Sequence, residues 1–158
     1  EIRDVVTEVT VLTPAGDIRT FLADQMEFGY RTSMVAKSGG IVLEARIKLH
    51  KGDPDAIRAR MEELREKRVG RQPLEYPSAG STFKRPEGYF AGKLIEDAGL
   101  RGLTVGKAQV SEKHCGFVVN KGGATAADVS ELMRRVSAKV EETFGVRLEP
   151  EVKRLGEF

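Results

Sequence analysis

Apolar and polar residues alternate along the first fifty residues, which is the pattern of half-buried β-strands. The stretch VVTEVTVLTPAGDIRTFLA keeps this alternation on both sides of PAGD, so residues 5–12 and 17–22 are predicted to form a β-hairpin. GGIVLEARIKLH predicts another strand over about 41–49. Between them, MEFGYRTSMVAK contains the helix-breaking Gly29 and groups the polar side chains of residues 30–33, which makes this segment a candidate wall of a binding site.

The pattern then changes to one that predicts a helix. Asp53 is a suitable N-cap, Pro54 suits the first helical position, and Gly70 is expected to end the helix. Basic residues within it alternate with glutamates, which favours a solvated face with i,i+4 ion pairs over a stripe that binds phosphate or nucleic acid. The apolar positions on one face of this helix are Ile57, Met61 and Leu64.

The remainder of the chain mixes helices and strands. YFAGKLIEDAGLRG predicts a short helix ended by Gly99, and LTVGKAQVSEKHCGFVVN predicts two strands joined around residues 111–114. TAADVSELMRRVSAKVEETFG predicts a helix capped by Thr125 and ended by Gly145. The expected buried stripe of this helix is Val129, Leu132, Met133, Val136 and Val140. VRLEPEVKRLG predicts a last strand broken at Pro150. Hairpin-like connections without regular βαβ alternation indicate the α+β class.

Composition narrows the class of protein. The chain has 158 residues, 40% of them hydrophobic and 32% charged, which suits one sizeable core or two small ones. Lys and Arg exceed Asp and Glu only by 26 to 24, so a global basic field for nucleic acid is absent. No apolar run has membrane-spanning length and no signal peptide opens the chain, so a cytoplasmic location without a membrane partner is expected. Because the chain begins with Glu and enters a strand pattern at once, we expect it to be the C-terminal part of a longer protein.

The histidines and the single cysteine offer little catalytic chemistry. His50 and His114 are the only histidines, and with one cysteine they form a zinc site only if carboxylates are added, so no metal is expected. Cys115 excludes an internal disulfide, and beside His114 on a strand it is expected to be a small buried residue rather than a nucleophile. KGG at 121–123 and AKSGG at 36–40 are interpreted as turns rather than phosphate-binding loops.

The most unusual stretch is PSAGSTFKRP, residues 77–86. Small residues from Pro77 to Ser81 precede the cations Lys84 and Arg85. Small residues let a ligand approach the backbone, and adjacent cations favour an anionic ligand. Ser81 lacks the G-x-S-x-G context of hydrolases and on pattern alone is more typical of a turn, but the cations keep it as a candidate.

Four motifs, FGYR, YPSAGSTFKRP, GYFAGKLIEDAGLRG and LEPEV, follow one another along essentially the whole chain. Together they resemble the MurB family of UDP-N-acetylenolpyruvoylglucosamine reductases in its shorter form. The resemblance implies an oxidoreductase of peptidoglycan synthesis that uses FAD and NADPH. In this family NADPH reduces the flavin, which passes a hydride to UDP-N-acetylglucosamine enolpyruvate and gives UDP-N-acetylmuramate. We expect a monomer with this substrate and NADPH as its ligands and no nucleic-acid partner.

The resemblance also assigns roles to single residues. Ser81 of AGS matches the proton donor, and Arg31 of FGYR and Glu151, the second Glu of LEPE, match its two active-site partners. Arg71 of GRQP stands where the family often has Lys, and because the two cations differ in geometry its role is open. The positions that resemble substrate contacts are Tyr30, Lys84, Arg85 and Arg71.

The glycine-rich segments with which this family binds the FAD pyrophosphate lie upstream of anything in this sequence. The resemblance therefore implies the second half of a flavin-binding domain with an inserted α+β substrate-binding domain. Residues 1–50 and 149–158 would be the partial FAD-binding domain, 51–71 a connecting helix and 72–148 the substrate-binding domain. A chain of this extent is expected to retain FAD poorly and to be inactive by itself.

The chemistry of the reaction agrees with these roles. Hydride addition to the enolpyruvyl group leaves negative charge that spreads into the carboxylate, so cations and donors must face it. Arg31 can clamp that carboxylate, and Glu151 is expected to be a neutral hydrogen-bond donor, because an ionised carboxylate would repel the same oxygens. Ser81 can supply the proton, and Lys84 and Arg85 can hold substrate phosphate.

Two other classes of protein remain open on the sequence. A non-catalytic nucleotide-sugar or phosphate-binding module would use the GSTFKRP loop without redox chemistry. A nucleic-acid-binding α+β domain would use the cations of residues 58–71 and a strand face, although no pair of stacking aromatic residues accompanies them.

Overall fold

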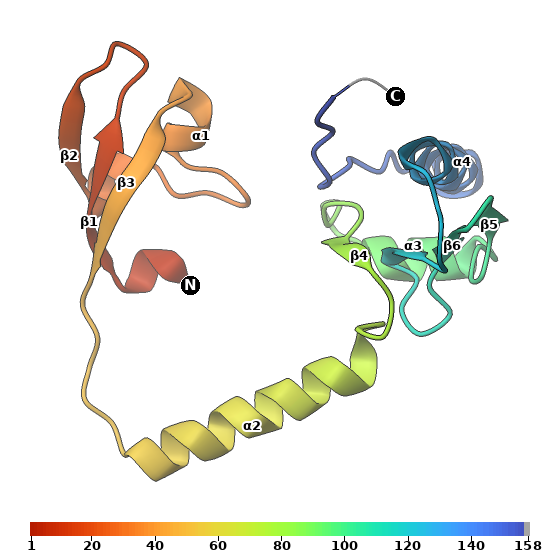
Figure 1. The fold of residues 1–158 in the computed structure, drawn as a ribbon, viewed down its shortest axis with the longest axis horizontal. Helices are drawn as coiled ribbons and strands as arrows, with labels where there is room; N and C mark the ends of the chain where they lie inside the picture. Colours follow the sequence, from red (N-terminus) through yellow and green to blue (C-terminus); the bar gives the residue numbers. More distant parts are fainter. Residues whose placement is uncertain (157–158) are drawn as a thin grey trace. The chain divides into compact units, whose positions relative to one another are not determined.

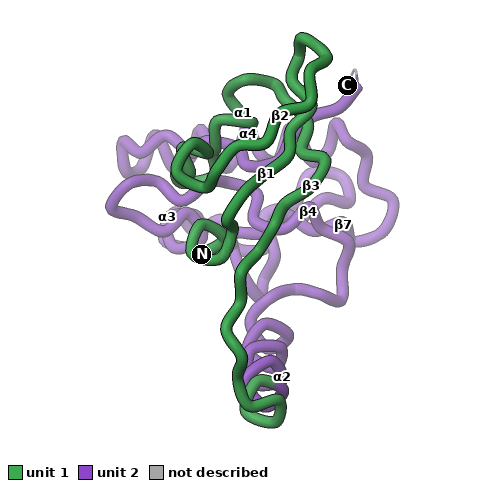
Figure 2. Tube along the Cα trace, turned by 90° about the vertical axis from the view of Figure 1, so that its left-hand side faces the viewer, with its two compact units in different colours: residues 1–57 green, residues 58–158 purple. Residues whose placement is uncertain are grey.

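The structure is a computed structural model that describes residues 1–156. They divide into two compact units, residues 1–57 and the residues from Arg58 onward (Figure 2). Antiparallel sheets and helices are mixed along the chain (Figure 1), which confirms the α+β class predicted from the sequence.

The first unit is built on a three-stranded antiparallel sheet in the order β2-β1-β3. Its strands are β1 (Val6–Leu12), β2 (Ile18–Leu22) and β3 (Ile41–Ile47). The predicted hairpin is confirmed, because β1 and β2 pair directly across the turn that follows Leu12. Val9 and Val11 of the central strand β1 point into a small core because successive side chains on a strand face opposite sides, and Val6 joins them across an irregularity in the pairing with β3. This core consists of Val6, Val9, Val11, Met26 and Val35.

One short helix precedes β1, and two more lie between β2 and β3. They are the 3-10 helices η1 (Ile2–Asp4) and η2 (Ala23–Met26) and the α-helix α1 (Met34–Ser38). The turn predicted at 36–40 is therefore only partly correct, since its first three residues belong to α1. Gly39 follows as a left-handed cap with φ of +73°. A five-residue helix is too short for hydrophobic periodicity to reveal it.

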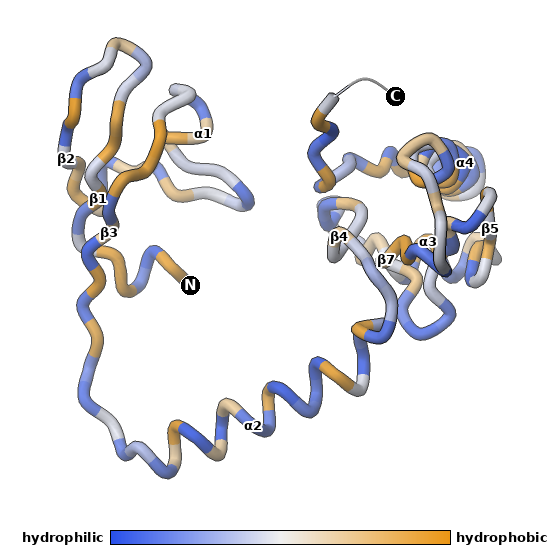
Figure 3. Tube along the Cα trace, in the orientation of Figure 1, coloured by the Kyte–Doolittle hydropathy of each residue, from blue (hydrophilic) through white to orange (hydrophobic). Residues whose placement is uncertain are grey.

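Apolar side chains are exposed along β3. Every residue of this strand is exposed, and Val42 and Leu43 keep 50% and 51% of their surface. Because these two are consecutive, they point to opposite faces of the sheet. Figure 3 shows β3 as a mostly apolar strand. Strand β3 is also an edge strand of the sheet. The first unit therefore exposes an apolar edge strand, which folded proteins usually cover.

The helix predicted after Asp53 is present as α2 (Pro54–Arg71). Its cap is confirmed, because the Asp53 carboxylate accepts a hydrogen bond from the Asp55 amide at 3.1 Å. The expected end at Gly70 is wrong by one residue, since Arg71 is still helical. The interleaved charges form ion pairs within the helix, Arg65 with Glu62 and Lys67 with Glu63, as a solvated face does. The apolar stripe of α2, Ile57, Met61 and Leu64, is exposed.

The second unit contains a four-stranded antiparallel sheet in the order β4-β7-β6-β5 with two helices. The elements are β4 (Ser78–Ser81), α3 (Ala91–Asp97), β5 (Thr104–Val105), β6 (Ala108–Val110), β7 (Phe117–Asn120) and α4 (Ala126–Phe144). The first of the two strands predicted over 103–120 is split into β5 and β6 by a turn at Gly106, whose φ is +55°. A Cβ on Gly106 would lie 2.5 Å from the Asp128 carboxylate, so this turn requires glycine.

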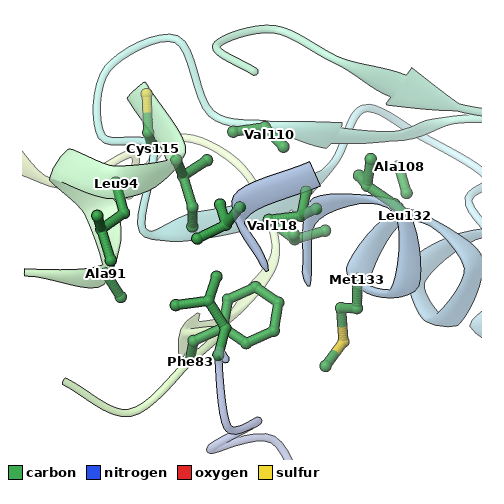
Figure 4. Packing of buried hydrophobic residues seen from close by; sticks show 13 residues of the cluster. Phe83, Ala91, Leu94, Ala108, Val110, Cys115, Val118, Leu132 and Met133 are labelled. Atoms are coloured by element: carbon green, nitrogen blue, oxygen red, sulfur yellow. The ribbon is translucent and has the colours of Figure 1, made fainter. Parts of the chain in front are cut away.

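Helix α4 covers the sheet and confirms the strongest pattern in the sequence. Thr125 accepts a hydrogen bond from the Asp128 amide at 3.1 Å, and the Asp128 carboxylate accepts one from the Thr125 amide at 2.9 Å. Gly145 ends the helix in the left-handed region with φ of +67°. Four of the five stripe residues, Leu132, Met133, Val136 and Val140, are buried, and Val129 is partly buried. In Figure 4, Phe83 points into this core together with Val118 and Met133.

Cys115 lies in the same core, as the sequence predicts. It is 5% exposed and forms no disulfide, but it belongs to the turn before β7 and not to a strand. In that turn the Gly116 amide donates to Nδ1 of His114 at 3.0 Å, which gives the histidine ring a structural contact.

Because Cys115 is buried, we expect its thiol to react slowly with disulfide reagents. Because desolvation raises the pKa of the Cys115 thiol, the reactive thiolate is scarce at pH 8 in the folded chain. We expect a disulfide reagent to modify Cys115 at least about tenfold more slowly in the folded chain than in urea. Spectrophotometric thiol titration measures this, and equal rates in both solvents would contradict the buried position.

The predicted last strand is wrong for the described residues. From residue 145 to 156 the chain forms no regular strand, and only Pro150 makes an isolated antiparallel bridge, with Phe83. Proline lacks the amide that a continuous ladder needs. Residues 157–158 of the predicted partial FAD-binding domain lie outside the described residues.

In the part of the chain that the structure describes, no helix has the length and apolar character to cross a membrane. No group of three or more His, Cys, Asp or Glu side chains within residues 1–156 is arranged to hold a metal ion.

Candidate active site

Ser81 is the last residue of β4, at the exposed end of the sheet. Strand β4 pairs with β7 through Ser78 opposite Val119 and Ser81 opposite Phe117, with a bulge between the two pairs. Gly80 lies in this bulge with φ of +84°, a value that glycine adopts without strain. The small residues of PSAGS therefore form an irregular edge strand, and not the loop that the sequence suggests.

The next residue, Thr82, anchors the end of β4 through hydrogen bonds. Thr82 is 3% exposed, and its hydroxyl oxygen accepts a hydrogen bond from the Val118 amide at 2.9 Å. Its own amide donates to the Gly116 carbonyl at 2.9 Å. Both bonds attach the residue beside Ser81 to β7 and to the turn before it, so the Ser81 backbone is held by a buried polar anchor.

Glu151 reaches the same place from the other end of the sequence. Its amide donates to the Thr82 carbonyl at 3.0 Å, and the Lys84 amide donates to the Glu149 carbonyl at 2.8 Å. These two bonds flank the bridge between Phe83 and Pro150. Proline is tolerated there because neither bond uses its nitrogen. The backbone of Glu151 therefore lies beside the residue that follows Ser81.

The two cations after Ser81 have different surroundings. The Lys84 ammonium forms an ion pair with the Glu149 carboxylate, and the lysine side chain is only 33% exposed. The Arg85 guanidinium lies 3.9 Å from the centre of the Phe90 ring, and its Nε donates to the Tyr89 carbonyl at 3.2 Å. Arg85 is thus held in place by cation–π and hydrogen-bond contacts at an exposed position.

Tyr30 and Arg31 occupy a tight turn in the first unit. The Gly29 amide donates to the Thr32 carbonyl at 3.0 Å, and the Thr32 amide donates back to Gly29 at 3.3 Å. Arg31 has φ of +56°, a left-handed conformation that costs a residue with a side chain about 1 to 2 kcal/mol. Such strain is often found at functional sites, where the surrounding structure maintains it.

This turn forms one side of a cavity of about 600 Å³ in the first unit. The cavity is lined by residues 28–33, Ala36 and residues 1–3. The Arg31 guanidinium lies 5.9 Å from the centre of the Tyr30 ring. The segment predicted to be a site wall does line a cavity, with an arginine and an aromatic ring in it.

The predicted site residues thus fall into two groups. Ser81 and Glu151 come together through backbone pairing in the second unit, whereas Tyr30 and Arg31 share a turn in the first. Arg71 is the exposed last residue of α2. Sequence reasoning missed Thr82 and Glu149. In the sequence, Thr82 is marked only by its position after Ser81, and Glu149 only by its position within LEPE. Neither position reveals the burial of Thr82 or the pairing of Glu149.

Comparison with known proteins identifies the family of this chain. The model of the C-terminal domain of UDP-N-acetylenolpyruvoylglucosamine reductase matches residues 72–155. A UDP-N-acetylenolpyruvoylglucosamine reductase from Agathobacter rectalis is 62% identical over 100% of the chain, which covers 50% of that relative. One of the same name from Lachnoclostridium phytofermentans is 55% identical over 99% of the chain and 51% of the relative.

A solved structure agrees with these relatives. The crystal structure of UDP-N-acetylenolpyruvylglucosamine reductase (MurB) from Thermus caldophilus has a TM-score of 0.80 and 41% identity. The match covers 96% of this chain and 54% of that one. The chain therefore belongs to the MurB family of UDP-N-acetylenolpyruvoylglucosamine reductases, as the four motifs predict. It spans about half the length of the curated relatives it matches.

Proposed function

We propose that this chain provides the substrate-handling residues of an FAD- and NADPH-dependent reductase that converts UDP-N-acetylglucosamine enolpyruvate to UDP-N-acetylmuramate for peptidoglycan. The observation that supports this most is the pairing of residues 149–151 with residues 82–84. It brings a hydroxyl-bearing residue, Ser81, and a carboxyl-bearing residue, Glu151, to neighbouring backbone positions. The family resemblance implies a joint role for these two residues and Arg31.

Bound FAD, once reduced by NADPH, would supply the hydride that forms a C–H bond at the terminal carbon of the enolpyruvyl group. The electron pair of the double bond then moves to the adjacent carbon and into the substrate carboxylate. Arg31 binds that carboxylate through two parallel N–H donors and stabilises the added charge. Ser81 protonates the adjacent carbon and regains a proton from solvent. Glu151 donates a hydrogen bond to the same charge as a neutral carboxyl group.

The other proposed contacts serve the remaining parts of the substrate. Arg85 is exposed and held by the Phe90 ring and the Tyr89 carbonyl, so its guanidinium is pre-oriented for a phosphate oxygen. Tyr30 offers an aromatic face and a hydroxyl in the cavity beside Arg31. The proposed substrate contacts are Tyr30, Arg71 and Arg85. Lys84, the fourth position that resembles a substrate contact, is paired with Glu149.

The predicted division into domains is retained in this proposal. Residues 1–50 and 149–158 would contribute to an FAD-binding domain, 51–71 would connect, and 72–148 would bind substrate. The exposed apolar residues of β3 support the view that the first unit is an incomplete domain. By the resemblance, the glycine-rich segments that bind the FAD pyrophosphate lie upstream of this sequence, so the chain alone is expected to retain little FAD and to be inactive.

The proposal is tested with a hybrid reductase, in which this chain replaces the segment it matches in the Agathobacter rectalis relative. We expect the hybrid reductase to be yellow, to bleach with NADPH and to regain its colour when UDP-N-acetylglucosamine enolpyruvate is added. Visible absorption spectroscopy follows all three states. If the folded hybrid protein is colourless and cannot be reconstituted with FAD, the proposed reductase function is excluded. Retained binding of the nucleotide sugar by such a protein would favour the non-catalytic module.

A further inference from the structure

Lys84, one of the predicted substrate contacts, has its charge paired within the second unit. Its ammonium forms an ion pair with the carboxylate of Glu149, a residue 65 positions later in the sequence. The same two residues are joined by the hydrogen bond from the Lys84 amide to the Glu149 carbonyl. Side chain and backbone therefore make a double connection between the residues that follow Ser81 and the segment that carries Glu151.

This connection adds to the apolar contacts of the segment, in which Val146 and Val152 pack against the core of the second unit. Residues 145–156 form no regular helix or strand within the described chain, and Pro150 has no amide to donate. Leu148, 3% exposed, anchors the segment before the bridge, and the Glu151 amide bonded to the Thr82 carbonyl anchors it after the bridge. The Lys84–Glu149 ion pair is the side-chain contact between these two anchors.

We propose that Lys84 is a positioning residue, which acts through Glu149 to hold Glu151 beside Ser81 rather than by binding the substrate. This inference rests on the proposed function, since it concerns how that site is assembled. It also gives the two neighbouring cations different roles: Arg85, exposed beside Phe90, stays a proposed substrate contact, and Lys84 is assigned to the assembly of the site.

We expect loss of the Lys84–Glu149 ion pair to lower the rate constant for reduction of the substrate, without weakening substrate binding. A displacement of about 1 Å in a catalytic group can cost about 100-fold in rate. Loss of one partly exposed ion pair allows a smaller displacement, so we expect about a tenfold slower reaction of the reduced hybrid reductase with the enolpyruvyl substrate. Flavin reduction by NADPH does not need Glu151, so its rate should not change.

The experiment compares Lys84→Ala, Glu149→Ala, the double alanine variant and the charge-swapped pair Lys84→Glu with Glu149→Lys in the hybrid reductase. Stopped-flow spectroscopy measures both half-reactions, and the substrate concentration dependence separates the rate constant from the dissociation constant. We expect equal losses in the two single variants, no further loss in the double alanine variant, and a swapped pair that is faster than either single variant.

A matched control is Lys93→Ala, which removes an exposed lysine paired with Asp97 on α3 and should leave both half-reactions unchanged. If Lys84→Ala weakens substrate binding while Glu149→Ala does not, or if the swapped pair is no faster than the single variants, Lys84 acts on the substrate and the proposal is wrong. The proposed function is judged separately, because it fails only if the unmodified hybrid reductase does not react with NADPH and the enolpyruvyl substrate.

Discussion

Replacing Ser81 with alanine is expected to slow the reaction of the reduced hybrid reductase with UDP-N-acetylglucosamine enolpyruvate by about 100- to 10,000-fold. The reason is that only this step requires a proton at carbon, and Ser81 is the proposed donor. Reduction of the flavin by NADPH should continue at nearly its normal rate. Stopped-flow absorbance of the flavin measures the two half-reactions independently.

Ser78→Ala is the matched control for this prediction. Ser78 is a serine on the same strand, and its hydroxyl oxygen accepts only a local hydrogen bond, from the Gly80 amide at 3.2 Å. We expect Ser78→Ala to leave both half-reactions close to those of the unmodified protein. Equal slowing of both half-reactions by Ser81→Ala would instead mean that the PSAGS strand has only a structural role.

The second large effect separates Arg31 from Glu151. Arg31 is proposed to bind the substrate carboxylate before the reaction and to stabilise the charge during it. Arg31→Ala should therefore raise the dissociation constant of the substrate and also lower the rate constant for its reduction. Removing a bidentate charged contact costs about 2 to 5 kcal/mol, which is about 30- to 4,000-fold in the combined constant.

Glu151 is proposed to matter mainly once charge develops. Glu151→Gln keeps a neutral hydrogen-bond donor, so it should bind substrate almost normally and retain more activity than Glu151→Ala. Titration of the oxidised hybrid reductase with substrate gives the affinities, and single-turnover reduction gives the rates. If the Gln and Ala variants are equally inactive while both bind substrate, Glu151 acts by proton transfer or by its charge, and Ser81 is not the sole proton source.

Local patterns predict the regular elements of this chain well. Helix α4, with its Thr125–Asp128 caps and its buried stripe, agrees with the sequence because capping and 3.6-residue periodicity are local properties. The β1–β2 hairpin is predicted for the same reason. Strand β4 and helix α1 are missed, since each is four or five residues long and β4 is made of small residues that favour turns.

The assembly of the site cannot be derived from local patterns. Glu149 and Lys84 are 65 positions apart, and only tertiary pairing shows that the last Glu-Pro-Glu lies against the Ser81 loop. The sequence indicates Lys84 and Arg85 as equivalent cations. Their contacts differ, because one faces a carboxylate and the other an aromatic ring. What identified Ser81, Arg31 and Glu151 was the order of family motifs rather than any pattern of charge or hydrophobicity.

The most direct test of the account is a crystal structure of the oxidised hybrid reductase with UDP-N-acetylglucosamine enolpyruvate bound. The account predicts that the Ser81 hydroxyl, the Glu151 carboxyl group and the Arg31 guanidinium all contact the enolpyruvyl group, with Lys84 still paired to Glu149. An enolpyruvyl group bound away from Ser81 and Glu151 would contradict it.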